Sequence, residues 1–165
     1  MAIIGITRTL PVNVLKLVKE DMASALQEAN GGQAMPPFIE FNLARPKEPH
    51  WPFITCYRRR TSKIEQIFDQ SVGEPKTFSA EFAIEIGSSA DTEDGVREEN
   101  EVRQDAVDTI LLSTIEDSPG ALLEGFDDEI KGLLSFNISE WVNGNNVHNG
   151  GKHYIVGAGT LIVSF

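Results

Sequence analysis

The sequence predicts an α+β fold in which two helices pack on one face of a mostly antiparallel β-sheet, within a single domain spanning residues 1–165. Two segments place apolar residues three and four positions apart, as amphipathic helices do, and several shorter segments alternate apolar with polar residues, as half-buried strands do. A length of 165 residues is ordinary for one domain and is enough to bury a core. The expected order is one helix, two or three strands, a long helix and two further strands.

The first element is expected to be a helix from about Pro11 to Ala29. Thr9 and Pro11 are suited to its start. Gly31 and Gly32 follow its end and are suited to stop it. Its apolar residues fall on one stripe, at Val14, Leu15, Val18, Met22, Leu26 and Ala29.

Three segments are then expected to be strands, over Pro37–Ala44, Phe53–Arg59 and Thr77–Gly87. In the last of these, apolar residues occupy every second position: Phe78, Ala80, Phe82, Ile84 and Ile86. The stretch Arg45–Pro52 contains three prolines and is expected to be a loop. The segment Lys63–Gln70 fits a short helix or a strand.

A long second helix is expected to begin after Ser88 and Asp91, which match a capping box, and to run to about Ile115. The segment Ser118–Gly120 is expected to end it. The inner stripe of this helix, with Arg103 contributing its aliphatic stem, comprises Val96, Arg103, Ala106, Val107, Ile110, Leu111 and Ile115.

The remaining elements are a strand over Leu133–Val142, an Asn- and Gly-rich loop over Asn143–Gly151 and a last strand over Tyr154–Phe165. The run Gly157–Gly159 lacks the third glycine and the following helix of a dinucleotide-binding motif. We therefore expect a β-bulge or close packing there, and no nucleotide site.

The charge of the chain is strongly acidic and unevenly distributed. The sequence has 14 Lys and Arg against 25 Asp and Glu, a net charge of -11. Residues 1–90 are neutral overall, whereas 14 of the acidic residues fall between Asp91 and Glu129. Such an excess disfavours binding of the chain as a whole to nucleic acid or to an anionic membrane. The candidate acidic surface, which would face a lumen or a docking partner, comprises Asp91, Glu93, Asp94, Glu98, Glu99 and Glu101.

The concentrated basic feature is the triplet Arg58, Arg59 and Arg60, a candidate subunit or partner interface. In a regular strand, Arg58 and Arg60 would face one way and Arg59 the other. The triplet is suited to meet carboxylates of a neighbouring chain, and the acidic block of a second copy is an available partner. A solvated strand end is the alternative interpretation.

No metal site is expected. The acidic run resembles part of an EF-hand, but its first and third ligand positions hold Ala90 and Thr92, which removes two carboxylates. The three histidines, His50, His148 and His153, show neither a helical i, i+4 pair nor nearby Cys or carboxylate partners, as a zinc site would.

No catalytic constellation is evident either. The single cysteine, Cys56, excludes an internal disulfide, and its mid-strand position predicts a buried core thiol rather than a nucleophile. No Ser/His/Asp or paired-carboxylate arrangement stands out, and no apolar run approaches the roughly 18 residues of a membrane span. We expect a soluble, non-secreted protein without cofactors that is not an enzyme and works through its surfaces.

An N-terminal amphipathic helix, a proline-bounded strand pair, the alternating strand Phe78–Ile86, a long acidic helix and the strand Thr160–Phe165 follow one another along nearly the whole chain. This order resembles the tail terminator, or tail completion, proteins of tailed bacteriophages. The resemblance implies a subunit of a hexameric ring that caps the tail tube and joins it to the neck. The implied partners are other copies of the chain, tail tube and sheath subunits, and a head-completion or connector protein, with DNA only in passage through the lumen.

The resemblance places the protein in the neck or tail of the virion, after assembly in the host cytoplasm. Another neck or head–tail connector subunit is an alternative within the same class. A rival of a different class is an acidic binding protein that imitates DNA, with carboxylates between Asp91 and Glu129 in place of phosphates.

Overall fold

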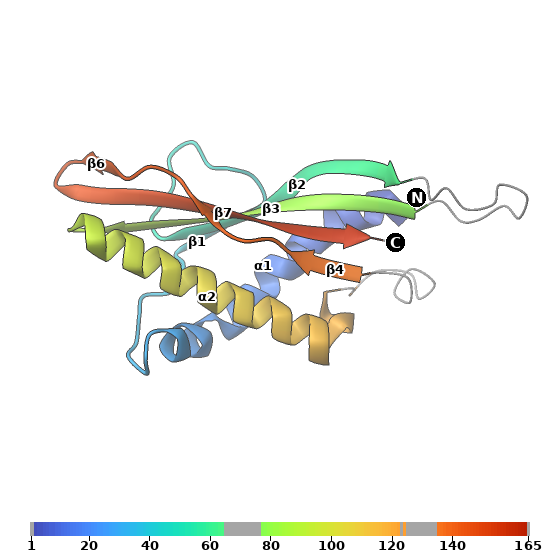
Figure 1. Cartoon of the computed structure of the whole chain (residues 1–165), viewed down its shortest axis with the longest axis horizontal. Helices are drawn as coiled ribbons and strands as arrows, with labels where there is room; N and C mark the ends of the chain where they lie inside the picture. The colour runs from blue at the N-terminus through green and yellow to red at the C-terminus, as the bar shows by residue number, and fades with distance from the viewer. Residues whose placement is uncertain (1, 65–76, 123, 125–134, 165) are drawn as a thin grey trace, which may run out of the picture.

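The computed structural model describes residues 2–64, 77–122, 124 and 135–164. In these residues it confirms the predicted α+β class, because two long helices lie against a mixed, mostly antiparallel sheet (Figure 1). The elements in chain order are α1 (Ala2–Ala29), β1 (Glu40–Asn42), β2 (Phe53–Ile64), β3 (Thr77–Ala90), α2 (Glu93–Asp117), the short 3-10 turn η2 (Pro119–Ala121), β4 (Ser135–Ile138), β5 (Val142–Asn143), β6 (Val147–Asn149) and β7 (Lys152–Ser164).

The sheet has the order β1-β2-β3-β7-β4, and β5 and β6 also pair with β7. The three long strands β2, β3 and β7 are antiparallel and form its centre, while β1 runs parallel to β2 at one edge. At the other edge, β4, β5 and β6 lie one after another along β7, opposite residues 161–164, 157–158 and 152–154. The edge is therefore one interrupted strand. The single strand predicted over Leu133–Val142 and the loop predicted over Asn143–Gly151 were wrong, because this region contains the three short strands β4, β5 and β6.

Helix α1 begins at least nine residues before the predicted start at Pro11, which lies inside the helix. A proline within a helix forgoes one backbone hydrogen bond. Leu10 is fully buried and Pro11 is also buried, so the apolar stripe continues past the expected boundary. The burial of Leu10 and Pro11 offsets the lost hydrogen bond. The prediction that Thr9 and Pro11 start the helix was therefore wrong.

Helix α2 is capped by Thr92, whose hydroxyl accepts a hydrogen bond from the Gly95 backbone N–H at 3.0 Å. The predicted capping box of Ser88 and Asp91 was wrong because β3 continues to Ala90 and buries Ser88. The predicted inner stripe is confirmed, since its members are buried, apart from the half-buried Ile115.

The core lies between the helices and the inner face of the sheet. The predicted apolar face of β3 is confirmed at Ala80, Phe82, Ile84 and Ile86, which are buried in the core, while the side chain of Phe78 lies outside the described part of the chain. Ala83 and Glu85 on the opposite face are buried as well. Cys56 is also buried, and desolvation raises the pKa of its thiol to about 12, as suits a core residue.

The strand predicted over Pro37–Ala44 shrinks to the three residues of β1. Ile39 and Leu43 are 67% and 53% exposed, because they flank this short edge strand, whereas Phe41 is partly buried against the core. Strand β2 runs past the predicted Arg59 to Ile64, so the first two residues of the ambiguous segment Lys63–Gln70 are strand and the rest lie outside the described residues.

Candidate assembly surfaces

The outward side of α2 carries an acidic stripe. Asp94, Glu98, Glu101, Asp105 and Leu112 recur at spacings of three, four and seven residues, and all are exposed. Residues at these spacings share one face of a helix. Among the described residues no ion pair neutralises these four carboxylates.

The other predicted acidic residues are paired within the subunit. Asp91 lies 3.3 Å from Lys152 Nζ. Glu93 and Glu99 each lie 3.4 Å from the arginine one turn further along α2. Of the six residues of the candidate acidic surface, the structure thus aligns Asp94, Glu98 and Glu101 on the acidic stripe and pairs the other three within the subunit, although the pairs of Asp91 and Glu93 are exposed and weak.

Helix α1 carries a matching basic stripe, formed by Arg8, Val12, Lys16 and Lys19. All four are exposed and follow one another at spacings of four, four and three residues. Lys16 Nζ also lies 3.4 Å from Glu124 Oε2, in an ion pair that is exposed and therefore weak. Sequence reasoning missed this stripe because it considered only the buried side of α1, although the same helical spacing was there to be used.

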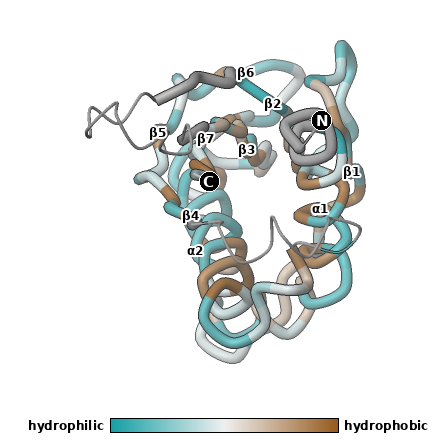
Figure 2. The backbone as a smooth tube through the Cα atoms, turned by 90° about the vertical axis from the view of Figure 1, so that its right-hand side faces the viewer, coloured by the Kyte–Doolittle hydropathy of each residue, from teal (hydrophilic) through white to brown (hydrophobic). Residues whose placement is uncertain are grey.

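Exposed large hydrophobic residues lie on both sides of the molecule and on the sheet face away from the helices. Val12, Ile39 and Leu43 lie around α1 and β1, where a shallow depression of about 260 Å³ joins Val12 to Leu43. On the side of α2 the exposed residue is Leu112, whereas Val142 of β5 and Val147 of β6 line hollows on the sheet face away from the helices. Figure 2 shows α1 and β1 on one side of the molecule and α2, β4 and β5 on the other. We call these sides the basic flank and the acidic flank.

The arginine triplet lies on β2, next to β1 in the sheet. The β2–β3 register shifts between Arg58, which pairs with Phe82, and Arg60, which pairs with Glu81. This β-bulge at Arg59 breaks the simple alternation that the sequence predicted for the three residues. Arg58 and Arg59 are exposed, and Arg59 lines a cavity on the sheet face away from the helices, whereas the side chain of Arg60 lies outside the described part of the chain.

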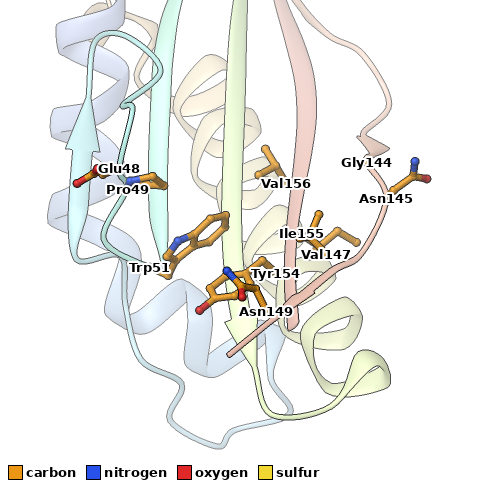
Figure 3. Close-up of a pocket in the computed structure, with 10 residues that line it drawn as sticks. All are labelled: Glu48, Pro49, Trp51, Gly144, Asn145, Val147, Asn149, Tyr154, Ile155 and Val156. Atoms are coloured by element: carbon orange, nitrogen blue, oxygen red, sulfur yellow. The ribbon is translucent and has the colours of Figure 1, made fainter. Parts of the chain in front are cut away.

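The sheet face away from the helices holds two adjoining cavities of about 580 and 480 Å³, which share Gly144 and Val156 in their walls. Figure 3 shows the larger one between the loop at Glu48–Trp51 and the β6–β7 hairpin. Its floor is aromatic, with the Trp51 and Tyr154 rings 5.0 Å apart. The lining also includes Pro49, Val147 and Ile155, so the cavity is suited to accept an apolar group.

The smaller cavity contains a buried carboxylate. Glu85 of β3 is about 3% exposed and accepts hydrogen bonds from Arg45 Nε at 3.2 Å, from a second Arg45 nitrogen and from the Thr55 hydroxyl at 3.3 Å. Hydrogen bonding to Glu85 raises the pKa of Arg45, and burial raises the pKa of Tyr57. The alternation of β3 predicts that Glu85 lies on the outer face of the sheet, but nothing in the sequence predicts its hydrogen bonds with Arg45.

A buried polar network joins α2 to both edges of the subunit. Arg103 donates to the Ser88 hydroxyl at 2.8 Å and to the Pro36 carbonyl at 3.1 Å. The next residue, Gln104, donates to Asn143 Oδ1 at 2.6 Å. Arg103 is about 2% exposed, and its burial lowers its pKa. This network fixes the segment before β1 and the strand β5 to one helix, and so sets the two flanks relative to each other.

The predicted close packing at the C-terminal glycines is confirmed. A Cβ atom on Gly157 would lie 2.2 Å from Gln104 Nε2, and one on Gly159 would lie 3.1 Å from the Trp141 ring. Neither residue can carry a side chain without moving its neighbours. Because these two glycines have no side chain, β7 can lie close to α2 and to the β4–β5 connection.

No known family model matches the chain, and no curated protein matches its sequence. Within the described parts of the chain, no cluster of three or more His, Cys, Asp or Glu residues is placed to hold a metal ion. No described helix is both long and apolar enough to cross a membrane.

Proposed function

We propose that the chain is a non-enzymatic structural subunit of a tailed bacteriophage, a tail terminator that assembles head to tail into a closed ring. The observation that carries the proposal is the pair of opposite flanks. One combines the basic stripe with three exposed aliphatic residues, and the other combines the acidic stripe with the exposed Leu112. Charge steers such a contact and fixes its register, while the aliphatic groups supply area that can be removed from water.

The flanks favour a head-to-tail contact over a two-fold one. A two-fold contact places a surface against itself, which would oppose Glu98 and Glu101 to the same residues of the partner. Like charges in contact cost several kcal/mol. A contact between the acidic flank of one copy and the basic flank of the next avoids that cost, and it generates a ring when the rotation closes.

The place in the virion rests on the resemblance in element order and on the overall charge. A ring of subunits that each carry a net charge of -11 repels a DNA phosphate backbone, so DNA would pass without binding. As a tail terminator, the ring is expected to be a hexamer that contacts tail tube and sheath subunits on one side and a head-completion or connector protein on the other.

Light scattering after size-exclusion chromatography, followed by negative-stain imaging, tests the assembly. We expect a closed ring of uniform size that binds the ends of purified tail tubes. A particle that stays monomeric at all concentrations and ignores tail tubes contradicts the proposal. A ring that binds connector rings but not tail tubes indicates another neck subunit.

The acidic stripe also favours one function of a different class, imitation of DNA. Its carboxylates recur every three or four residues, about 5–6 Å apart along the helix, which is comparable to a row of phosphates. A DNA mimic would act as a monomer and compete with DNA for a basic enzyme. Competition by the monomer, abolished by charge reversal on the acidic stripe, would favour this rival.

A further inference from the structure

The β6–β7 hairpin brings two of the three histidines together. His148 of β6 pairs directly with His153 of β7, at the end of the sheet away from the marked chain ends (Figure 1). Their separation of five residues matches no helical pair, which is why the sequence predicted no metal site. Across a tight hairpin the same separation makes them neighbours.

The turn fixes this pairing. Gly150 and Gly151 have φ values of 60° and 78°, the positive values that a two-residue type I′ turn requires. Asn149 and Lys152 close the turn, and the histidines form the next pair outward. In a two-residue hairpin this is the pair without mutual backbone hydrogen bonds, in which opposite side chains come closest.

The two imidazole rings lie parallel, with centroids 4.2 Å apart and an interplanar angle of 2°. Bonds from zinc to an imidazole nitrogen are about 2.0–2.1 Å long, and the lone pair of each nitrogen lies in the plane of its ring. The stacked rings must therefore turn out of parallel before one nitrogen of each can reach a common ion, and the exposed His148 is the ring that would turn.

Asn146 supplies an independent observation. Its side-chain nitrogen lies 3.0 Å from His153 Nδ1, and its Oδ1 is buried without a hydrogen-bond partner among the described residues. A half-turn of the amide places Oδ1 where it accepts the Nδ1–H of His153. Histidines that bind metals through Nε2 almost always donate Nδ1–H to such an oxygen.

We propose that His148 and His153 form a two-histidine chelate site for Zn²⁺, Ni²⁺ or Cu²⁺, with water in the remaining positions. Imidazole suits these ions, whereas Mg²⁺ and Ca²⁺ prefer oxygen ligands. Asp91 stays ion-paired to Lys152 beside the site and is not a ligand. The bound ion clamps β6 to β7, and this proposal is independent of ring assembly.

Titration calorimetry of the untagged full chain with zinc or nickel chloride tests the site, together with NMR of the imidazole ring nitrogens. We expect one ion per chain, resonance shifts confined to His148 and His153, and loss of binding in both His148→Ala and His153→Ala. Asn146→Ala retains both ligands and should weaken binding by about 10–100-fold. Magnesium chloride should not bind.

His50→Ala is the matched control, since it removes the third histidine from a different loop and should leave binding unchanged. The NMR shifts on the unmodified chain keep the test independent of any folding defect in a variant. Absence of binding by the unmodified chain, full binding by His148→Ala, or loss of binding in His50→Ala would each overturn the proposal.

Discussion

The two helices bury similar apolar stripes against one face of the sheet, yet their exposed stripes carry opposite charge. The basic stripe of α1 holds Arg8, Lys16 and Lys19, although Glu20, Asp21 and Glu28 are also exposed on this helix, and the acidic stripe of α2 holds a row of Asp and Glu. The buried sides determine the fold, because apolar burial does not depend on the sign of surface charge. The exposed sides contribute little to the free energy of unfolding, and in the proposed ring they determine which flanks of two subunits contact each other.

The largest expected effect comes from reversing each stripe separately. Replacing Asp94, Glu98 and Glu101 together by Lys makes the acidic stripe net positive and gives a variant with two basic flanks, whereas Lys16→Glu with Lys19→Glu makes the basic stripe net negative and gives a variant with two acidic flanks. Each should remain a folded monomer, because like charges in contact cost several kcal/mol and weaken association by about 100-fold or more. Sedimentation velocity measures the loss.

Mixing these two variants provides the control. Every contact in an alternating ring then joins a basic to an acidic flank, so an even-numbered ring such as a hexamer should form again. Assembly by either variant alone, or failure of the mixture to assemble, would contradict the proposed contact between the flanks.

The next effect concerns the buried side of α2, where two Arg–Glu pairs of the same spacing differ in exposure. Arg103→Ala removes the hydrogen bonds to Ser88 and to the Pro36 carbonyl and leaves a cavity. It should lower the free energy of unfolding by about 2–4 kcal/mol. Arg97→Ala, which breaks only the exposed pair with Glu93, should cost about 0.3–0.5 kcal/mol. Urea denaturation measures both, and equal losses would refute a structural role for the Arg103 network.

A smaller loss is expected where β7 passes beneath α2. Gly157→Ala forces Gln104 and Asn143 aside and should cost about 1–3 kcal/mol. Gly120→Ala meets nothing within 4 Å and should change stability by less than about 0.5 kcal/mol. Thermal unfolding distinguishes them, and an unaffected Gly157→Ala would show that the contact relaxes freely.

The fold class was predictable because alternation in β3 and the helical stripe in α2 are strong, local and set by burial. The errors arose where tertiary packing overrode local preference. Pro11 is a common helix-start residue, but burial carries α1 through it. Ser88 resembled a helix cap, but its hydroxyl is committed to Asn100 and Arg103 instead.

The candidate surface was only partly predictable. Sequence located the acidic block, and the spacing of Asp94, Glu98 and Glu101 already placed them on one side of a helix. It did not reveal which acids are paired inside the subunit, since the partner of Asp91 is 61 residues away along the chain. The contact between His148 and His153 was not predictable, because it depends on the tight turn at Gly150 and Gly151, and the sequence predicted only a flexible loop there.

The position of β7 has a consequence for biosynthesis. This strand is made after every other described element, yet it lies inside the sheet, between β3 and the β4–β6 edge. Until it emerges from the ribosome, β3 has one open edge and the β4–β6 segment has no partner. The edge formed by β4, β5 and β6 is therefore completed only once β7 has been made.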